Sequence, residues 1–347
     1  MRTTILAATL LSLAAGLLIA GPLTPPAGTV ASTYKTLGEV EPRIPINAAN
    51  TPGDATSLYR ITAPGSYYLT GNIFGAAGKH GIVIATNNVT IDLAGFSVLG
   101  TATSLNGITL SGARSSIVVR NGSITGWAGD GLNLFAGRGI LIEDIVSNSN
   151  ASWGIISGVA SNIRHCSASQ NGTGFASDGG IGCDEKSLVE SCTADANNGT
   201  GLAFGTGGTL QNCTSTRNTV TGINGGYECT VTGCTVEGGV RGIEVYLGST
   251  VSDCRVFEVS LNAITAADGC EVHNNHCFAS APTTGSRGIY IQGSDARVES
   301  NVCSGFEIGF STSGTHTFFS RNTARNNTTN WIIPAANTCY VVSANAG

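Results

Sequence analysis

Short apolar runs recur along most of the chain, and residues such as Gly, Asn, Ser and Thr separate them. Within a run apolar and polar residues alternate, as in VTID (89–92). Alternation with a period of two is typical of half-buried β-strands. No stretch has a helical run, and Lys and Glu are scarce. The pattern therefore predicts an all-β protein built from many short strands.

The runs belong to a repeat that can be aligned in two columns. The first column holds the residue three positions after the apolar residue that opens each unit. In chain order it reads Asp92, Arg120, Glu143, Cys166, Cys192, Cys213, Cys234, Cys254, Asn275, Asn301 and Asn322. The second column is Gly followed by an apolar residue, as in Gly201-Leu202 and Gly222-Ile223, and the rung between residues 166 and 192 contributes Gly174-Phe175. Such regular self-similarity indicates a solenoid.

A coil of parallel strands fits these units better than a leucine-rich repeat does. In a strand coil each turn hydrogen-bonds to the next at about 4.8 Å, so equivalent residues stack into files. The leucine-rich consensus needs an apolar residue two positions before the apolar residue that opens each unit. This chain has Ser161, Ser187 and Gly208 there, and no stretch suits the convex helices.

With these columns the chain resembles the right-handed parallel β-helix family, the pectate-lyase-like superfold, from about Tyr59 to Trp331. Members of that family stack Asn side chains in one turn of each coil, as Asn275, Asn301 and Asn322 would here. The segment 57–73 also resembles the first rung of secreted bacterial β-helix proteins. The resemblance implies an all-β, single-stranded right-handed parallel β-helix of about a dozen coils. It implies no single activity, since the fold hosts lyases, hydrolases, epimerases and non-enzymes.

Four segments are expected along the chain. Residues 1–20 combine Arg2 with an apolar run from Ile5 to Ala20, which indicates a secretory signal peptide, with a retained N-terminal anchor as the alternative. Residues 21–56 and 330–347 are expected to cap a β-helix that spans 57–329. We therefore expect a secreted protein, extracellular or in the periplasm or envelope, without stable membrane insertion.

Charge and cysteine content narrow the partners and cofactors. The net charge is −5, without a cationic surplus, so nucleic acid is not an expected partner. Eleven cysteines are present. A zinc site usually needs two close Cys pairs, and only Cys229 and Cys234 lie close together, so no metal site is expected. The column cysteines are stacked thiols or disulfides between neighbouring rungs, and Cys277 and Cys303 form a second candidate pair.

The resemblance also says where chemistry would lie. In the similar enzymes the active groove is on the sheet of Gly-apolar strands, and reactive groups precede the Gly or follow it by two residues. Asp130 suits a hydrolase at such a position, but its neighbours Asn106 and Trp153 supply no second carboxylate. No acidic cluster for a calcium-dependent lyase is present either, so Ca²⁺ is the only cofactor that the resemblance allows, and no residues are assigned to it.

One constellation at these positions stands out. The segments RGIEVY (241–246) and RGIYIQ (287–292) lie two rungs apart and are expected to share one outward face. Bidentate Arg suits uronate carboxylates, and aromatic faces suit sugar rings. The predicted substrate-binding residues are Arg241, Glu244, Tyr246, Arg287, Tyr290 and Gln292, with Arg241, Glu244 and Arg287 as catalytic candidates. The alternative is an ordinary solvated strand face with a cross-rung ion pair.

A nearby segment, SDGGIGCDEKS (177–187), reads as a loop inserted in a long rung. Its charged residues would either overhang a groove or lie in a plain surface loop, and the surface loop is the default. They are Asp178, Asp184, Glu185 and Lys186.

Two functions from different classes follow. The first is an exported protein that binds, or as a lyase or glycoside hydrolase processes, a polysaccharide or cell-surface glycan along its strand groove. The second is a non-catalytic structural or adhesive protein of the cell surface or envelope.

Overall fold

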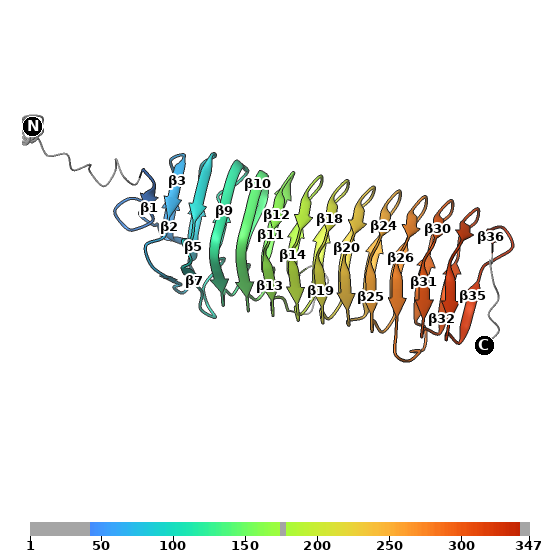
Figure 1. Cartoon of the computed structure of the whole chain (residues 1–347). Coiled ribbons are helices and arrows are strands. Elements are labelled where there is room, and N and C mark those ends of the chain that lie inside the picture. Colours follow the sequence, from blue (N-terminus) through green and yellow to red (C-terminus); the bar gives the residue numbers. More distant parts are fainter. Residues whose placement is uncertain (1–41, 174–177, 341–347) are drawn as a thin grey trace, which may run out of the picture. The chain divides into compact units, whose positions relative to one another are not determined.

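The computed structural model describes residues 42–173 and 178–340, and within them it contains strands and turns but no α-helix. The segment expected to be a signal peptide and most of the expected N-terminal cap lie outside the described residues. From Arg43 onward the chain forms one unit, a parallel β-solenoid of about 14 turns (Figure 1). The predicted all-β solenoid is thereby confirmed.

The strands form three parallel files, here called sheets A, B and C. Sheet A contains β2 (Ser57–Ile61), β5 (His80–Ile84), β8 (Ile108–Leu110), the start of β10 (Leu132–Asn148), β11 (Ile155–Val159), β14 (Gly179–Cys183), β17 (Thr200–Phe204), β20 (Thr221–Gly225), β23 (Arg241–Val245), β26 (Asn262–Ala266), β29 (Arg287–Ile291), β32 (Ile308–Thr312) and β35 (Thr329–Ile332). Its strands carry the Gly-apolar column.

Sheets B and C complete each turn of the coil. Sheet B contains β1 (Ile44–Pro45), β3 (Gly65–Tyr68), β6 (Val89–Asp92), β9 (Arg114–Thr125), the middle of β10, β12 (Asn162–Arg164), β15 (Leu188–Glu190), β18 (Thr209–Gln211), β21 (Thr230–Thr232), β24 (Thr250–Ser252), β27 (Glu271–His273), β30 (Arg297–Glu299), β33 (Phe318–Ser320) and β36 (Thr338–Tyr340). Sheet C contains β4 (Ile73–Phe74), β7 (Ser97–Leu99), the ends of β9 and β10, β13 (Ser167–Ser169), β16 (Thr193–Asp195), β19 (Thr214–Thr216), β22 (Thr235–Glu237), β25 (Arg255–Phe257), β28 (His276–Phe278), β31 (Val302–Ser304) and β34 (Thr323–Arg325). Parallel pairs thus lie on both sides of the boundaries expected at residues 57 and 329.

The core is a set of files of identical or similar apolar residues. In sheet A, Leu202, Ile223, Ile243 and Ile264 are register partners on consecutive strands, and each is fully buried. Burying apolar surface contributes about 25 cal/mol per Å², so each additional coil adds a similar amount of stabilising buried surface.

The glycine column of sheet A has a steric cause. A Cβ atom added at Gly222 would lie 2.4 Å from Cγ1 of Val236 and 3.0 Å from the carbonyl oxygen of Gly242. This glycine therefore faces the interior, as does the apolar Ile223 that follows it. Because two consecutive residues face inward, the residues on either side of the pair face outward, and these are the positions where the sequence places candidate chemistry.

The cysteine and asparagine column is a buried ladder at the turn between sheets B and C. The backbone N–H of Cys192 donates to Sγ of Cys213 at 3.4 Å, and that of Cys254 donates to Oδ1 of Asn275 at 2.9 Å. Asn275 in turn donates from its backbone and its amide to Oδ1 of Asn301, at 2.9 and 3.0 Å. None of the cysteines in the described residues forms a disulfide, and the register partners Cys277 and Cys303 also stay thiols. Stacked thiols are the arrangement found.

The first three members assigned to that column belong elsewhere. Register pairs Glu143 with Arg164, not with Cys166, so Cys166 lies in the following turn. The outward file of sheet B reads Asp92, Arg120, Glu143, Arg164 and Glu190. The alignment was wrong because both positions lie three residues after an apolar residue, although one ends a strand and the other fills the next turn.

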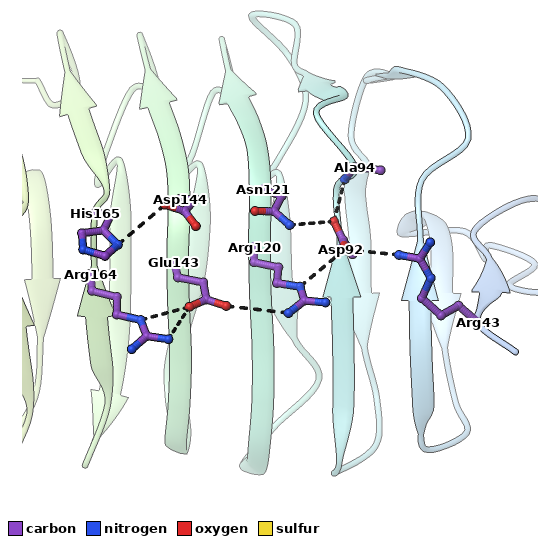
Figure 2. Close-up of polar contacts among 9 residues, drawn as sticks. All are labelled: Arg43, Asp92, Ala94, Arg120, Asn121, Glu143, Asp144, Arg164 and His165. Carbon is purple, nitrogen blue, oxygen red and sulfur yellow. Dashed lines mark hydrogen bonds and ion pairs between the residues drawn. The ribbon is translucent and has the colours of Figure 1, made fainter. Parts of the chain in front are cut away.

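This outward file is a ladder of alternating charge, which Figure 2 shows together with Arg43. Arg43 lies 3.2 Å from Asp92, Arg120 lies 3.4 Å from Asp92 and 3.8 Å from Glu143, and Arg164 lies 2.6 Å from Glu143. Asp92 and Glu143 are each held between two guanidiniums, so the file avoids the like-charge stacking that a coil otherwise imposes. Partly exposed pairs of this kind contribute about 0–1 kcal/mol each.

A second buried ladder, between sheets C and A, was not predicted. It consists of Asn150, Asn171, Asn197 and Asn218, each donating its amide and backbone N–H to Oδ1 of the next, at 2.9–3.0 Å. The signal was present as Asn four residues before the column Gly, as in NNGTG (197–201) and NTVTG (218–222). The asparagine side chains thus provide hydrogen-bond partners for backbone groups of a turn that has no strand pairing.

Replacing the column glycine should destabilise the coil. We expect Gly222→Ala to lower the free energy of unfolding by about 1–3 kcal/mol, because its methyl group would overpack Val236. The matched control is Gly71→Ala, since nothing lies within 4 Å of a Cβ built there. Thermal denaturation measures both, and an equal melting temperature for the two variants would contradict the steric explanation.

Removing one rung of the second asparagine ladder should cost more than removing an exposed neighbour. Asn197→Ala removes the oxygen that accepts from both the buried backbone N–H and the side-chain amide of Asn171, so we expect a loss of at least about 2 kcal/mol. Asn198 is exposed, and Asn198→Ala should change stability by less than about 0.5 kcal/mol. Urea titration compares the two, and similar midpoints would show that the ladder carries no stability.

Candidate functional site

The outward face of sheet A is where the sequence places its candidate residues. Register stacks Glu244, Thr265 and Tyr290 on the consecutive strands β23, β26 and β29. Arg241 and Arg287 begin the first and third of these strands, so the two segments lie two coils apart, as the repeat indicates.

The six predicted residues nevertheless do not form one cluster. The guanidinium of Arg287 lies 4.0 Å from the centre of the Tyr290 ring, and the Tyr290 hydroxyl donates to Oγ of Ser313 at 3.2 Å. Gln292 is exposed beyond the end of β29. On the strand between the two segments, Asn262 donates to Oγ1 of Thr265 at 3.1 Å, and both side chains are buried. Arg287 and Tyr290 thus contact each other. The described residues show no hollow that this pair shares with Glu244.

The alternative of a cross-rung ion pair is not found either. The salt bridges within 42–173 and 178–340 include none with Arg241, Glu244 or Arg287. Within the described residues no salt bridge therefore joins these three catalytic candidates.

Tyr246 lies beside Tyr227, in a hollow that we call the tyrosine groove. The two rings are 5.7 Å apart between centroids and inclined at 45°. The groove has a volume of about 400 Å³ and follows the ends of β14, β17, β20 and β23. Its lining residues are Cys183, Asp184, Glu185, Ala203, Phe204, Gly205, Thr206, Asn224, Gly225, Gly226, Tyr227 and Tyr246.

Tightly stacked glycine turns line the groove. A Cβ atom at Gly205 would lie 2.7 Å from the backbone nitrogen of Glu185, and one at Gly226 would lie 2.6 Å from the backbone nitrogen of Thr206. The turns therefore pack backbone on backbone and project no side chain into the space between them. Tyr227 is 54% exposed, whereas Phe204, which also lines the groove, is buried.

The charged groups of the groove are carboxylates. Asp184 and Glu185 lie at the turn after β14, where Oδ1 of Asp184 accepts the backbone N–H of Glu185 at 2.8 Å. Burial raises the pKa of Tyr246, the negative charge of Glu244 adds to this, and Arg241 opposes it. The phenol is therefore neutral at physiological pH and is a hydrogen-bonding and stacking group rather than a base.

Cys183 also lines the groove but is not a nucleophile. Burial raises the pKa of its thiol to about 12, so the reactive thiolate is absent at neutral pH.

The segment 177–187 is not a simple inserted loop. Residues Gly179–Cys183 form β14, a full strand of sheet A, and register pairs Ile181 with Ile155 and Leu202. The column pair of this rung is thus Gly180-Ile181, while the expected Gly174-Phe175 lies outside the described residues. Asp178 is buried, where it accepts the backbone N–H of Thr173 at 3.0 Å. Only Asp184 and Glu185 border a groove.

The polar positions at the start of sheet A serve the backbone. Nδ1 of His80 accepts the N–H of Asn106 at 3.1 Å, and Oδ1 of Asn106 accepts the N–H of Asp130 at 3.0 Å. Oδ1 of Asp130 accepts the N–H of Trp153 at 2.9 Å. Each side chain thus caps the next strand, and the neighbours of Asp130 at these positions are Asn106 and Trp153.

Metal ligands and membrane spans were also sought. Across the described part of the chain, no group of three or more His, Cys, Asp or Glu side chains is arranged to hold a metal ion, so the structure assigns no ligands to calcium. Within the same residues, no helix is long and apolar enough to cross a membrane.

Comparison with solved structures finds the same fold at low sequence identity. The A-module of Azotobacter vinelandii mannuronan C-5 epimerase AlgE4 matches with a TM-score of 0.56 and 15% identity, over 80% of this chain and 91% of that one. The A-module of AlgE6 from the same organism matches with a TM-score of 0.52 and 15% identity, over 82% and 89%. The Dettilon tailspike protein matches with a TM-score of 0.56 and 14% identity, over 81% of this chain and 61% of that one. These likenesses show the fold alone.

Comparison of the sequence agrees with the fold. No curated protein matches the chain. A family model described as "Right handed beta helix region" matches residues 106–277, which cover coils of all three sheets. The resemblance found in the Gly, Cys and Asn columns is thereby confirmed, and the chain is a right-handed parallel β-helix protein.

Proposed function

We propose that this protein binds a glycan in the tyrosine groove of its exported β-helix. The observation that carries the proposal is the pair Tyr227 and Tyr246, 5.7 Å apart and 54% and 38% exposed, at the wall of a hollow of about 400 Å³. Exposed aromatic faces stack on the apolar faces of sugar rings, while their hydroxyls reach polar groups. A volume of this size lies within the usual range of small-ligand sites.

The remaining groups of the groove suit sugar hydroxyls. Asn224, which is partly exposed on β20, offers an amide donor and acceptor, and Asp184 and Glu185 offer acceptors. The glycine turns between them expose backbone groups at the surface of the same hollow. A site with an apolar wall and several convergent polar groups is the usual arrangement for recognition of a polar ring.

Binding rather than catalysis is proposed because of where the carboxylates lie. Glycoside hydrolysis in most families needs two carboxyl groups that flank the scissile bond from opposite sides. Asp184 and Glu185 are adjacent in sequence and occupy one turn at one edge of the groove. Glu244 with Arg241 and Arg287 stays a prediction for catalysis, and no contact among these three supports it.

The fold similarity is consistent with a polysaccharide partner, since two of the similar structures are named as mannuronan epimerase modules. Export of the protein, and a position outside the cell or in its envelope, belong to this proposal. The alternative is a rod-like structural or adhesive protein, which would need no groove of this kind, so the two functions differ in what the tyrosines contribute.

Glycan binding by the full chain tests the proposal. We expect affinity electrophoresis in gels containing neutral, amino-sugar or uronate polysaccharides to show retardation in at least one. The double variant Tyr227→Ala/Tyr246→Ala removes both stacking faces, and we expect at least about a tenfold weaker interaction, equivalent to about 1.4 kcal/mol.

Tyr340→Ala is the matched control, because Tyr340 is also exposed but lies on sheet B, away from the groove. It should migrate like the unmodified protein. Absence of retardation in every gel would overturn the proposal and favour the structural role. Retardation that Arg287→Ala/Tyr290→Ala abolishes, and the groove variant does not, would move the site to the surface predicted from sequence.

A further inference from the structure

The charged residues at the tyrosine groove indicate which class of sugar it accepts. From sequence, two arginines on sheet A pointed to a uronate ligand. In the structure Arg287 is stacked on Tyr290, outside the groove, and the described residues that line the groove include neither Arg nor Lys nor His. The charged lining residues are Asp184 and Glu185, and neither takes part in the salt bridges of the described residues.

The residues around the groove add to this negative charge. Glu244 follows Asn224 in the outward file of sheet A, and Glu228 is exposed directly after Tyr227. Lys186 and Arg241 are the nearby cations, next to Glu185 and at the start of β23. Counting Asp184, Glu185, Glu228 and Glu244 against these two cations leaves an excess of two negative charges, so a uronate carboxylate would meet like charge at close range. Such juxtaposition costs several kcal/mol.

The same groups are complementary to a cation. Carboxylates form charge-assisted hydrogen bonds with an ammonium group. Tyrosine faces also attract a cation that lies within about 6 Å of the ring, by about 0.5–2 kcal/mol. Tyr227 and Tyr246 offer two such faces in the hollow that Asp184 and Glu185 border. A sugar ring that carries a protonated amine would therefore use both the stacking surface and the carboxylates.

We propose that the tyrosine groove binds amino-sugar glycans through their protonated amines and discriminates against uronates. This inference rests on the proposed glycan-binding function and names its ligand class. Asp184 and Glu185 supply the selectivity for charge, while Tyr227 and Tyr246 supply affinity that is shared by charged and neutral sugars.

Three soluble oligosaccharides of equal length separate the contribution of the carboxylates from that of the tyrosines. They are glucosamine oligomers, their N-acetylated counterparts, and galacturonate oligomers. Titration calorimetry of the full chain should give the tightest binding for the glucosamine oligomer, weaker binding for the N-acetylated one and none for the uronate. Affinity for the amine should fall as salt rises, because screening weakens attraction at a partly exposed site. Affinity for the N-acetylated oligomer should change little with salt.

Variants then assign the selectivity to the two carboxylates. Asp184→Asn/Glu185→Gln should weaken binding of the glucosamine oligomer about tenfold, since charge-assisted hydrogen bonds become neutral ones, and should weaken binding of the N-acetylated oligomer less, because the amide oxygens of Asn and Gln still accept from sugar hydroxyls. Asp253→Asn is the control, because Asp253 is an exposed carboxylate at a turn between sheets B and C, outside the groove. It should bind both oligomers as the unmodified chain does.

The outcomes distinguish this inference from the function on which it rests. Tightest binding of the uronate, or equal binding of the amine and N-acetyl forms, would overturn the amino-sugar assignment and leave glycan binding intact. The same holds if the carboxylate variant loses both ligands alike. If none of the three oligomers binds and no polysaccharide gel retards the protein, glycan binding itself is wrong.

Discussion

The structure depends on one constraint, that each coil must stack directly on the next with its backbone hydrogen bonds intact. Parallel strands about 4.8 Å apart force equivalent side chains into contact along the axis. Every file must therefore tolerate its own repetition, and the chain meets this in three ways. Apolar residues stack in the core, Asn and Cys stack in the buried turns by donating to the next rung, and outward charges alternate in sign, as from Asp92 to Arg164.

The same constraint creates the surface on which function is proposed. Turns stack backbone on backbone at Gly205 and Gly226, and the tyrosine groove is lined by these turns. Tyr227 directly follows Gly226, and Tyr246 directly follows the next strand of sheet A, β23, so neighbouring coils bring two aromatic faces together. The rigid ladder positions these rings without any long-range loop, so the site is part of the repeat itself.

Much of the fold could be predicted because each coil of a solenoid contacts mainly its neighbouring coils, so the same requirements recur as a repeat in the sequence. The Gly of sheet A and the Cys–Asn ladder were visible as columns, since each has a steric or hydrogen-bonding requirement that recurs. The register of the strands was harder to predict. Glu143 and Cys166 both follow an apolar residue by three positions, and only the alignment of whole strands shows that they occupy different positions in the coil. The groove escaped sequence reasoning because Tyr227 lies in a turn, beyond the strand positions at which the family keeps its chemistry, so nothing in the sequence paired it with Tyr246.

The central claim, that a sugar occupies the tyrosine groove, is tested most directly by hydrogen exchange of the unmodified chain with and without glucosamine oligomer. Bound ligand excludes water from the turns that it covers, so the account predicts slower exchange of backbone amides in residues 203–206 and 224–227. Amides of residues 287–292 should be unchanged. Protection confined to β29 and its neighbours, or no protection at saturating ligand, would contradict the account.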